Sequence, residues 1–175
     1  MKKANGFTLI ELMITLTVLG ILLSIAVPSF FELLSNNRMT SATNSISAGL
    51  QAARSEAIIR KVPVIFCQNN GSGTGCAASI TSLAAGWVVG LDADLNGSID
   101  AGGVIRVADT FPASIAFTMT GFTGNFVRYN TQGMAAAPPT RIRICDSSRT
   151  GELGNDILFN GTGGVTVSPT KPTCT

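Results

Sequence analysis

The chain begins with a long apolar stretch that holds one charged residue. Glu11 lies near its start, and Leu12 to Phe31 are twenty residues without a charge, enough to span a bilayer as a helix. Lys2 and Lys3 precede the stretch and would keep the N-terminus on the cytoplasmic side. The pattern predicts one membrane-crossing helix. An ordinary signal peptide fits less well, because the stretch is long and no A-x-A cleavage site follows it.

Beyond Phe31 the apolar positions follow the spacing of an amphipathic helix. Its apolar face is formed by Ile46, Leu50, Ala53 and Ala57. Pro63 restricts the preceding residue to extended conformations, so the helix is expected to end near Lys61. We therefore expect one helix in two parts, an apolar part at residues 7–31 and an amphipathic part at residues 32–61 that packs on a sheet.

From Val62 onward, short apolar runs are separated by Gly, Asn, Asp and Pro, which is typical of β-structure. The runs predict strands at residues 62–67, 86–91, 104–109, 115–119, 125–130, 141–146, 156–160 and 165–167. Three Asn-Gly pairs predict tight turns with positive φ, at residues 70–71, 96–97 and 160–161. The expected fold class is α+β, in which residues 62–175 form an antiparallel β-rich head packed on the long helix.

Composition excludes more functions than it indicates. Apolar residues make up 45% of the chain and charged residues 13%, and the formal charge of +2 is too small to indicate a nucleic-acid binder by itself. Histidine is absent, which removes the commonest general base and metal ligand, and there is no G-x-S-x-G nucleophile motif. We therefore expect a protein without enzymatic activity and without a cofactor.

The four cysteines indicate an oxidising compartment. They form no C-x-x-C pair and lack the spacing of a zinc site, so in an exported chain they are expected to form two disulfides. Four cysteines allow three pairings. The local one joins Cys67 to Cys76 across a glycine-rich turn and Cys145 to Cys174, which would fasten a C-terminal tail rich in Pro and Thr.

The junction between the basic leader and the apolar stretch carries a motif. Residues 2–11 read KKANGFTLIE, and they resemble the signal of type IV prepilins and type II secretion pseudopilins. In that signal a short basic leader ends in Gly, Phe follows, and Glu is the fifth residue after the cut. The resemblance implies that prepilin peptidase removes residues 1–6 by cleaving between Gly6 and Phe7, and methylates the new amine of Phe7. It also implies a type IV pilin fold and assembly with other pilins or pseudopilins.

The same resemblance assigns assembly roles to Glu11 and Pro28. In the family, the residue matching Glu11 pairs with the N-terminal amine, usually of a neighbouring subunit. The helix dipole favours a carboxylate near a helix N-terminus, and pairing removes most of the energetic cost of burying the charge. Pro28 lacks a backbone N–H and clashes with the carbonyl of Ser24, so a kink or a locally melted turn is expected there.

Three segments of the head carry a second resemblance. They are the strand that contains Trp87, the turn DADLNGSID at residues 92–100, and RIRICDSSRTGE at residues 141–152. Together they resemble the soluble domain of the FimT and GspH class of minor pilins and pseudopilins. The resemblance implies a minor pilin in the tip or priming complex of a type IV pilus, anchored in the inner membrane with its head in the periplasm. Three alternatives stay open: a GspH-type pseudopilin of a type II secretion system, a DNA-binding minor pilin for natural transformation, and, outside the family, a membrane-anchored periplasmic binding module.

One turn of the head copies the first half of a calcium-binding loop. Asp92, Asp94 and Asn96 follow the D-x-D-x-N-G pattern, and Asp100 could supply a further oxygen. The bidentate Glu expected at loop position twelve is replaced by Gly103. The alternative interpretation is an ordinary hairpin turn built from the usual turn residues.

Basic residues of the head offer a candidate DNA contact. Arg141, Arg143 and Arg149 lie close together in the sequence, and Lys171 could lie nearby. The FimT branch is associated with DNA uptake through basic residues near the C-terminus, but the corresponding tail here has Lys171 and no arginine. The alternative is a solvated strand face whose arginines form ion pairs with nearby carboxylates.

Overall fold

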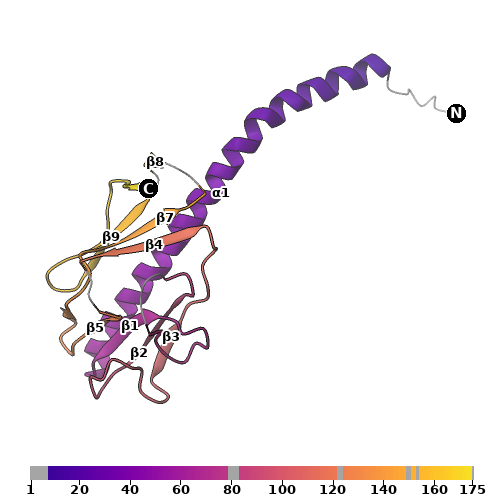
Figure 1. The fold of residues 1–175 in the computed structure, drawn as a ribbon. Helices are drawn as coiled ribbons and strands as arrows, with labels where there is room; N and C mark the ends of the chain where they lie inside the picture. The colour runs from indigo at the N-terminus through magenta and orange to yellow at the C-terminus, as the bar shows by residue number, and fades with distance from the viewer. Residues whose placement is uncertain (1–7, 79–82, 122–123, 149–150, 153, 175) are drawn as a thin grey trace. The chain divides into compact units, whose positions relative to one another are not determined.

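The computed structural model describes residues 8–78, 83–121, 124–148, 151–152 and 154–174. Within these residues it contains the long helix α1 (Leu9–Arg60), which is followed by short strands (Figure 1). The chain forms two compact units, Met1–Asn37 and Arg38–Thr175. The second unit contains the last part of α1 and all the strands, and it is the head.

Helix α1 joins the apolar and the amphipathic segment in one continuous element. It runs through Pro28, so the described helix has no melted turn there. It ends at Arg60, and Lys61 adopts a left-handed conformation with φ of 56°, a conformation that often terminates helices. The predicted end near Lys61 is confirmed.

All eight predicted strands are present, and the head adds three strands of two residues each. The first sheet has the order β3 (Val104–Val107), β2 (Trp87–Leu91), β1 (Val64–Gln68), β5 (Phe126–Tyr129) and β6 (Ala135–Ala136). The second sheet has the order β10 (Val165–Val167), β9 (Asn155–Phe159), β7 (Arg141–Asp146) and β4 (Ile115–Thr120). The remaining pair consists of β11 (Thr173–Cys174) and β8 (Gly151–Glu152). Every pairing among these strands is antiparallel, which confirms the α+β class with an antiparallel head.

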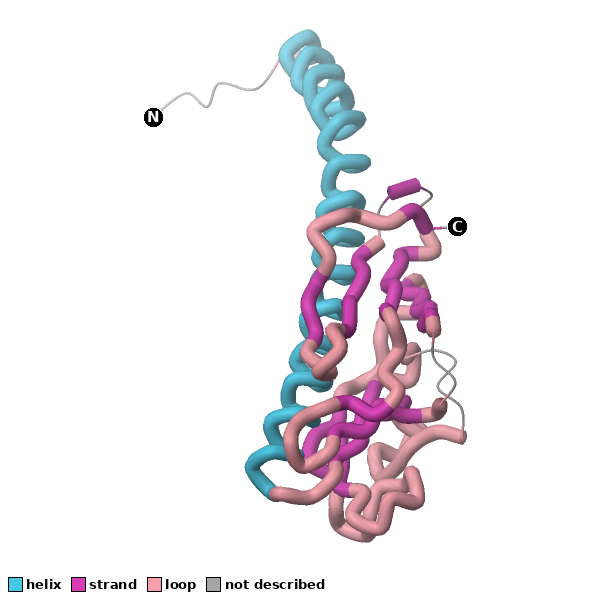
Figure 2. The backbone as a smooth tube through the Cα atoms, turned by 90° about the vertical axis from the view of Figure 1, so that its left-hand side faces the viewer, coloured by secondary structure: helices cyan, strands magenta, loops and turns pink. Residues whose placement is uncertain are grey.

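The apolar face predicted for the second part of α1 lies at the centre of the head's core. Its four residues, Ile46, Leu50, Ala53 and Ala57, are fully buried. They belong to one cluster with apolar residues of both larger sheets. In Figure 2 the strands lie along one side of this part of the helix. The helix is therefore a core element of the head as well as its connection to the N-terminal segment.

Close contacts hold α1 against the first sheet. A Cβ atom on Gly49 would lie 2.9 Å from the rings of Phe66 and Trp87, so the approach of the helix to these rings requires glycine. The indole Nε1 of Trp87 donates a hydrogen bond of 3.1 Å to the hydroxyl of Ser45. These contacts explain why a helix interior keeps a glycine, which lowers helix stability by roughly 1 kcal/mol relative to alanine.

Two of the three predicted Asn-Gly turns have the expected conformation. The φ angles of Gly71 and Gly97 are 91° and 84°. In the turn between β9 and β10, the positive φ of 79° lies at Gly163 and not at Gly161. The turn is wider than the predicted two-residue turn, because the carbonyl of Asn160 accepts the N–H of Gly163 at 2.9 Å. The prediction for this third turn is therefore wrong.

Candidate functional site

Residues 8–33 of the first unit form an exposed and mostly apolar helix surface. Leu9 is 76% exposed and Ile25 is 68% exposed. By length and composition α1 is able to cross a membrane, with a mean hydropathy of 2.4 over its most apolar window. Soluble monomers rarely expose contiguous apolar patches of more than about 600 Å², so this surface needs lipid or other helices to cover it.

Three hydroxyl groups within this surface are satisfied by the helix itself. Thr15, Thr17 and Ser24 donate hydrogen bonds of 2.7–2.8 Å to backbone carbonyls three residues earlier. An unpaired hydroxyl in hydrocarbon is energetically unfavourable, and this local bonding removes the penalty. The helix can therefore enter an apolar environment without leaving these groups unpaired.

Glu11 lies in the first turn of α1, which Thr8 caps. The Thr8 hydroxyl accepts the N–H of Glu11 at 3.3 Å, and the Thr8 carbonyl accepts the N–H of Leu12 at 3.2 Å. The T-x-x-E pattern of these residues is that of a capping box, a sequence signal for the helix start. Glu11 is exposed and accessible to a positive group from outside. The predicted processing residues, Gly6 and Phe7, lie outside the described residues.

Two disulfides close the head. Cys67 is bonded to Cys76, and Cys145 on β7 is bonded to Cys174 on β11. This is the local pairing expected from the sequence. Beside the second bond, Arg143 donates a hydrogen bond of 3.2 Å to the carbonyl of Thr173. The C-terminal segment is thus attached to the second sheet through β7.

The turn that copies a calcium loop is stabilised by the chain itself. Asp92 is fully buried, and its Oδ1 accepts the N–H of Gly97 at 3.1 Å. Its Oδ2 accepts a hydrogen bond of 2.7 Å from Nε of Arg128 on β5. The guanidinium therefore occupies a carboxylate oxygen that a cation would need.

The other oxygens proposed as calcium ligands also bond within the turn. Asp94 accepts the N–H and the side-chain amide of Asn96, and Asp100 accepts the N–H of Ala93 at 3.0 Å. Across the described residues, no group of three or more His, Cys, Asp or Glu side chains is placed to hold a metal ion. The geometry supports the hairpin interpretation and does not gather the predicted ligands around one point.

Replacing Asp92 with Ala should lower the free energy of unfolding by about 2 kcal/mol, because a half-buried guanidinium and a backbone N–H lose their partner. Denaturation of the full-length protein in detergent micelles, followed by fluorescence of the single tryptophan, measures this change. Asp109→Ala removes an exposed carboxylate and is the control, with an expected change below about 0.5 kcal/mol. Equal effects of the two substitutions would show that the pair of Asp92 and Arg128 does not stabilise the turn.

Two of the predicted DNA-contacting residues converge on one carboxylate. Arg143 forms hydrogen bonds of 3.0 and 3.1 Å with the two carboxylate oxygens of Asp156, and Nη1 of Arg141 lies 3.5 Å from Oδ2 of Asp156. The hydrogen bond to Asp156 raises the pKa of Arg143 above its ordinary value. A phosphate would have to compete with this carboxylate. Lys171 is exposed and Arg149 lies outside the described residues, so DNA contact stays a prediction.

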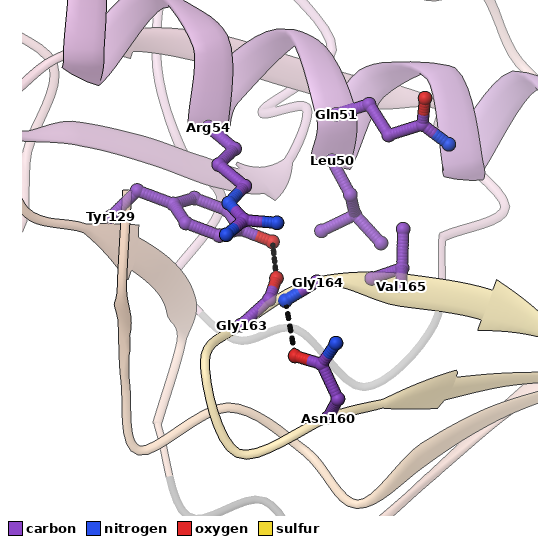
Figure 3. Close-up of a pocket in the computed structure, with 8 residues that line it drawn as sticks. All are labelled: Leu50, Gln51, Arg54, Tyr129, Asn160, Gly163, Gly164 and Val165. Atoms are coloured by element: carbon purple, nitrogen blue, oxygen red, sulfur yellow. Dashed lines mark hydrogen bonds between the residues drawn. The ribbon is translucent and has the colours of Figure 1, made fainter. Parts of the chain in front are cut away.

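A pocket of about 380 Å³ lies within the head between α1, β5 and the turn that connects β9 to β10 (Figure 3). On its wall, the hydroxyl of Tyr129 donates a hydrogen bond of 3.1 Å to the carbonyl of Gly163. Burial raises the pKa of Tyr129 above its ordinary value, and the positive charge of Arg54 acts in the opposite direction. Sequence analysis misses this pocket, because three segments far apart in the chain contribute to it and none carries a motif.

Two family models match the chain. The model described as type II transport protein GspH matches residues 42–170, and the model described as prokaryotic N-terminal methylation motif matches residues 1–27. The first match covers most of the head, and the second covers the leader and most of the apolar stretch.

Curated proteins similar to this chain are pilins and fimbrial proteins. The type IV major alpha-pilin of Moraxella bovis is 34% identical over 84 residues, which are 47% of this chain and 53% of that protein. Fimbrial protein EcpC of Eikenella corrodens is 35% identical over 97 residues, which are 55% of this chain and 61% of that protein. The chain thus spans between about half and three fifths of the length of these relatives.

Among solved structures, the type IV minor pilin FimU of Pseudomonas aeruginosa has a similar fold. The TM-score is 0.60 at 23% sequence identity, and the match covers 79% of this chain and 93% of that chain. At this level of identity the similarity establishes the fold alone.

Proposed function

Because this chain belongs to the GspH family, as a type IV minor pilin similar to FimT, FimU and GspH, we propose that it joins the tip or priming complex of a type IV pilus and supports pilus assembly. The methylation motif implies processing by a prepilin peptidase and assembly with other pilins. The proposed sequence of events is cleavage between Gly6 and Phe7, methylation of Phe7, residence in the inner membrane with the head in the periplasm, and transfer into the filament.

The contrast between the two units carries this proposal. The head buries its own apolar residues in one core, whereas residues 8–33 leave an apolar surface exposed. Lipid would cover that surface before assembly, and helices of neighbouring subunits would cover it afterwards. The satisfied hydroxyls of Thr15, Thr17 and Ser24 suit both environments.

Within that surface, Glu11 and Pro28 have separate proposed roles. The exposed carboxylate of Glu11 would pair with the amine of Phe7 on a neighbouring subunit and thereby set the axial register. Pro28 removes one hydrogen bond from α1, which weakens the helix locally and lets subunits adjust their packing. The proposed functional segments are the leader at residues 1–6, the filament helix at 7–31, its amphipathic continuation at 32–61 and the β-rich part of the head at 62–175.

Deletion of the gene in the source organism, with piliation, protein secretion and DNA uptake measured in the same strain, tests the proposal. We expect loss of surface pili with normal secretion. A GspH-type pseudopilin is the second candidate, favoured by the family model that matches residues 42–170, and it predicts loss of secretion with normal piliation. Loss of DNA uptake in a strain that keeps its pili would favour the DNA-binding role. Normal piliation would contradict the proposed function.

A further inference from the structure

Arg54 differs from the other half-buried arginines that the structure describes in the head. Each of the three others forms an ion pair with an aspartate. Arg54 forms none with a described residue, and its Nε donates a hydrogen bond of 2.9 Å to the carbonyl of Gly133. No other hydrogen bond of this guanidinium is formed within the described part of the chain. Its Nη1 and Nη2 donors are therefore available to an anion, and their planar geometry suits a carboxylate.

These donors lie at the wall of the pocket in Figure 3. A Cβ atom on Gly164 would lie 3.0 Å from Nη1 of Arg54, which places the guanidinium directly beside the turn between β9 and β10. Leu50 and Val165 supply apolar wall, and none of the lining residues is acidic. The pocket thus combines one positive charge with an apolar wall, and its volume of about 380 Å³ is within the range of small-molecule sites.

We propose that this pocket binds a carboxylate carried on a short aliphatic stem, with Arg54 as its anchor. The guanidinium would bind the two carboxylate oxygens, and Leu50 and Val165 would contact the stem. A single positive charge balances a carboxylate and leaves a phosphate dianion only half neutralised. The carboxylate has two sources, a free organic acid or an acidic side chain of another subunit. Binding of a free acid is independent of the proposed pilus role, and only the second source rests on it.

Two adjacent glycines give the pocket its shape and provide a variant that narrows it. Gly163 has φ of 79°, and a Cβ there would lie 2.5 Å from the backbone nitrogen of Ala135. On Gly164, by contrast, the nearest atoms to a Cβ are the flexible ends of the Asn160 and Arg54 side chains, at 2.7 and 3.0 Å. Gly164→Ala should therefore displace the end of the Arg54 side chain and narrow the pocket. It also crowds the Asn160 amide, whose Oδ1 accepts the N–H of Gly164 at 2.7 Å.

Titration of ¹⁵N-labelled full-length protein in detergent micelles with butyrate, a single carboxylate on a short aliphatic stem, tests the site. We expect saturable shifts of the backbone amide signals of the turn at residues 163–165. Arg54→Gln and Gly164→Ala should each weaken the affinity about tenfold or more. Arg106→Gln removes an exposed arginine on β3 and should leave the affinity unchanged.

Absence of saturable shifts in the wild-type protein would overturn the proposal, and so would unchanged affinity in Arg54→Gln. If Arg54→Gln does not fold, Gly164→Ala provides the same comparison, and unchanged affinity there overturns the proposal equally. Tighter binding of inorganic phosphate than of butyrate would overturn the assigned ligand class.

A photoreactive amino acid in place of Gln51, at the edge of the pocket, separates the two sources in cells. A cross-link to another pilin that disappears when Arg54→Gln is added would assign the carboxylate to a neighbouring chain. Absence of a cross-link, together with saturable binding of butyrate, would assign it to a free acid. The titration tests the carboxylate site, and deletion of the gene tests the pilus role. Normal piliation after deletion would therefore contradict the pilus role without changing the result of the titration.

Discussion

Replacing Glu11 with Ala should remove the protein from filaments while leaving it inserted in the membrane. In the proposed filament, the substitution would leave the amine of Phe7 on a neighbouring subunit without its partner in an apolar interface. Loss of one member of a buried ion pair destabilises by about 3–5 kcal/mol, which corresponds to a loss of incorporation of about a hundredfold or more. Immunoblots of sheared filaments and of the membrane fraction measure the distribution of the protein.

Glu32→Ala is the matched control for this experiment, because Glu32 is an exposed carboxylate further along the same helix. We expect this variant to enter filaments at the wild-type level. Incorporation of Glu11→Ala at the wild-type level would contradict the assembly role of Glu11. It would favour a simple membrane anchor, for which this residue is unimportant.

Replacing both Cys145 and Cys174 with Ser should cause the largest loss of head stability among the substitutions considered. The two cysteines are separated by 29 residues, and the loop-entropy relation gives a loss of about 3–4 kcal/mol for a loop of this length. The melting temperature should fall by about 10 °C. Thermal unfolding of the full-length protein in micelles, followed by circular dichroism, measures the change.

Removal of the other disulfide, Cys67 with Cys76, is the control for this prediction. These cysteines are separated by only 9 residues, so the expected loss is smaller, about 2–3 kcal/mol. Limited proteolysis provides a second readout, because only loss of the disulfide between Cys145 and Cys174 should expose the C-terminal segment to early cleavage. A melting temperature unchanged by the loss of Cys145 and Cys174 would show that the bond does not constrain the unfolded chain.

The helix and the longer strands could be predicted from the sequence, because their apolar residues recur with the period of a helix or of a strand. The apolar face at Ile46 and Leu50 has helical spacing, and Ile142 and Ile144 alternate with arginines in β7. Strands β6, β8 and β11 have two residues each and are too short to show any alternation. β6 pairs with β5 at the edge of the first sheet, whereas in the described part of the chain β8 and β11 pair only with each other, beside the disulfide of Cys174. All three therefore depend on tertiary contacts and not on a local pattern.

The candidate site residues also differ in whether a local sequence pattern reveals them. Glu11 is visible in the sequence because an isolated charge in an apolar stretch is a local anomaly. The pairing of Arg143 with Asp156 depends on the register between β7 and β9, which local patterns do not determine. Arg54 stands out only when its surroundings are known, because it forms no ion pair with a described residue, whereas the other half-buried arginines of the head do.

The continuity of α1 has a mechanical consequence. The helix that would be held in a filament is also the helix whose residues Ile46, Leu50, Ala53 and Ala57 form the centre of the head's core. Tension applied to the N-terminal part would pass along the helix backbone directly into that core, without a linker that could extend first. Pulling the head away from a filament would then require unfolding the head itself, so its resistance to force should depend on the rate of unfolding.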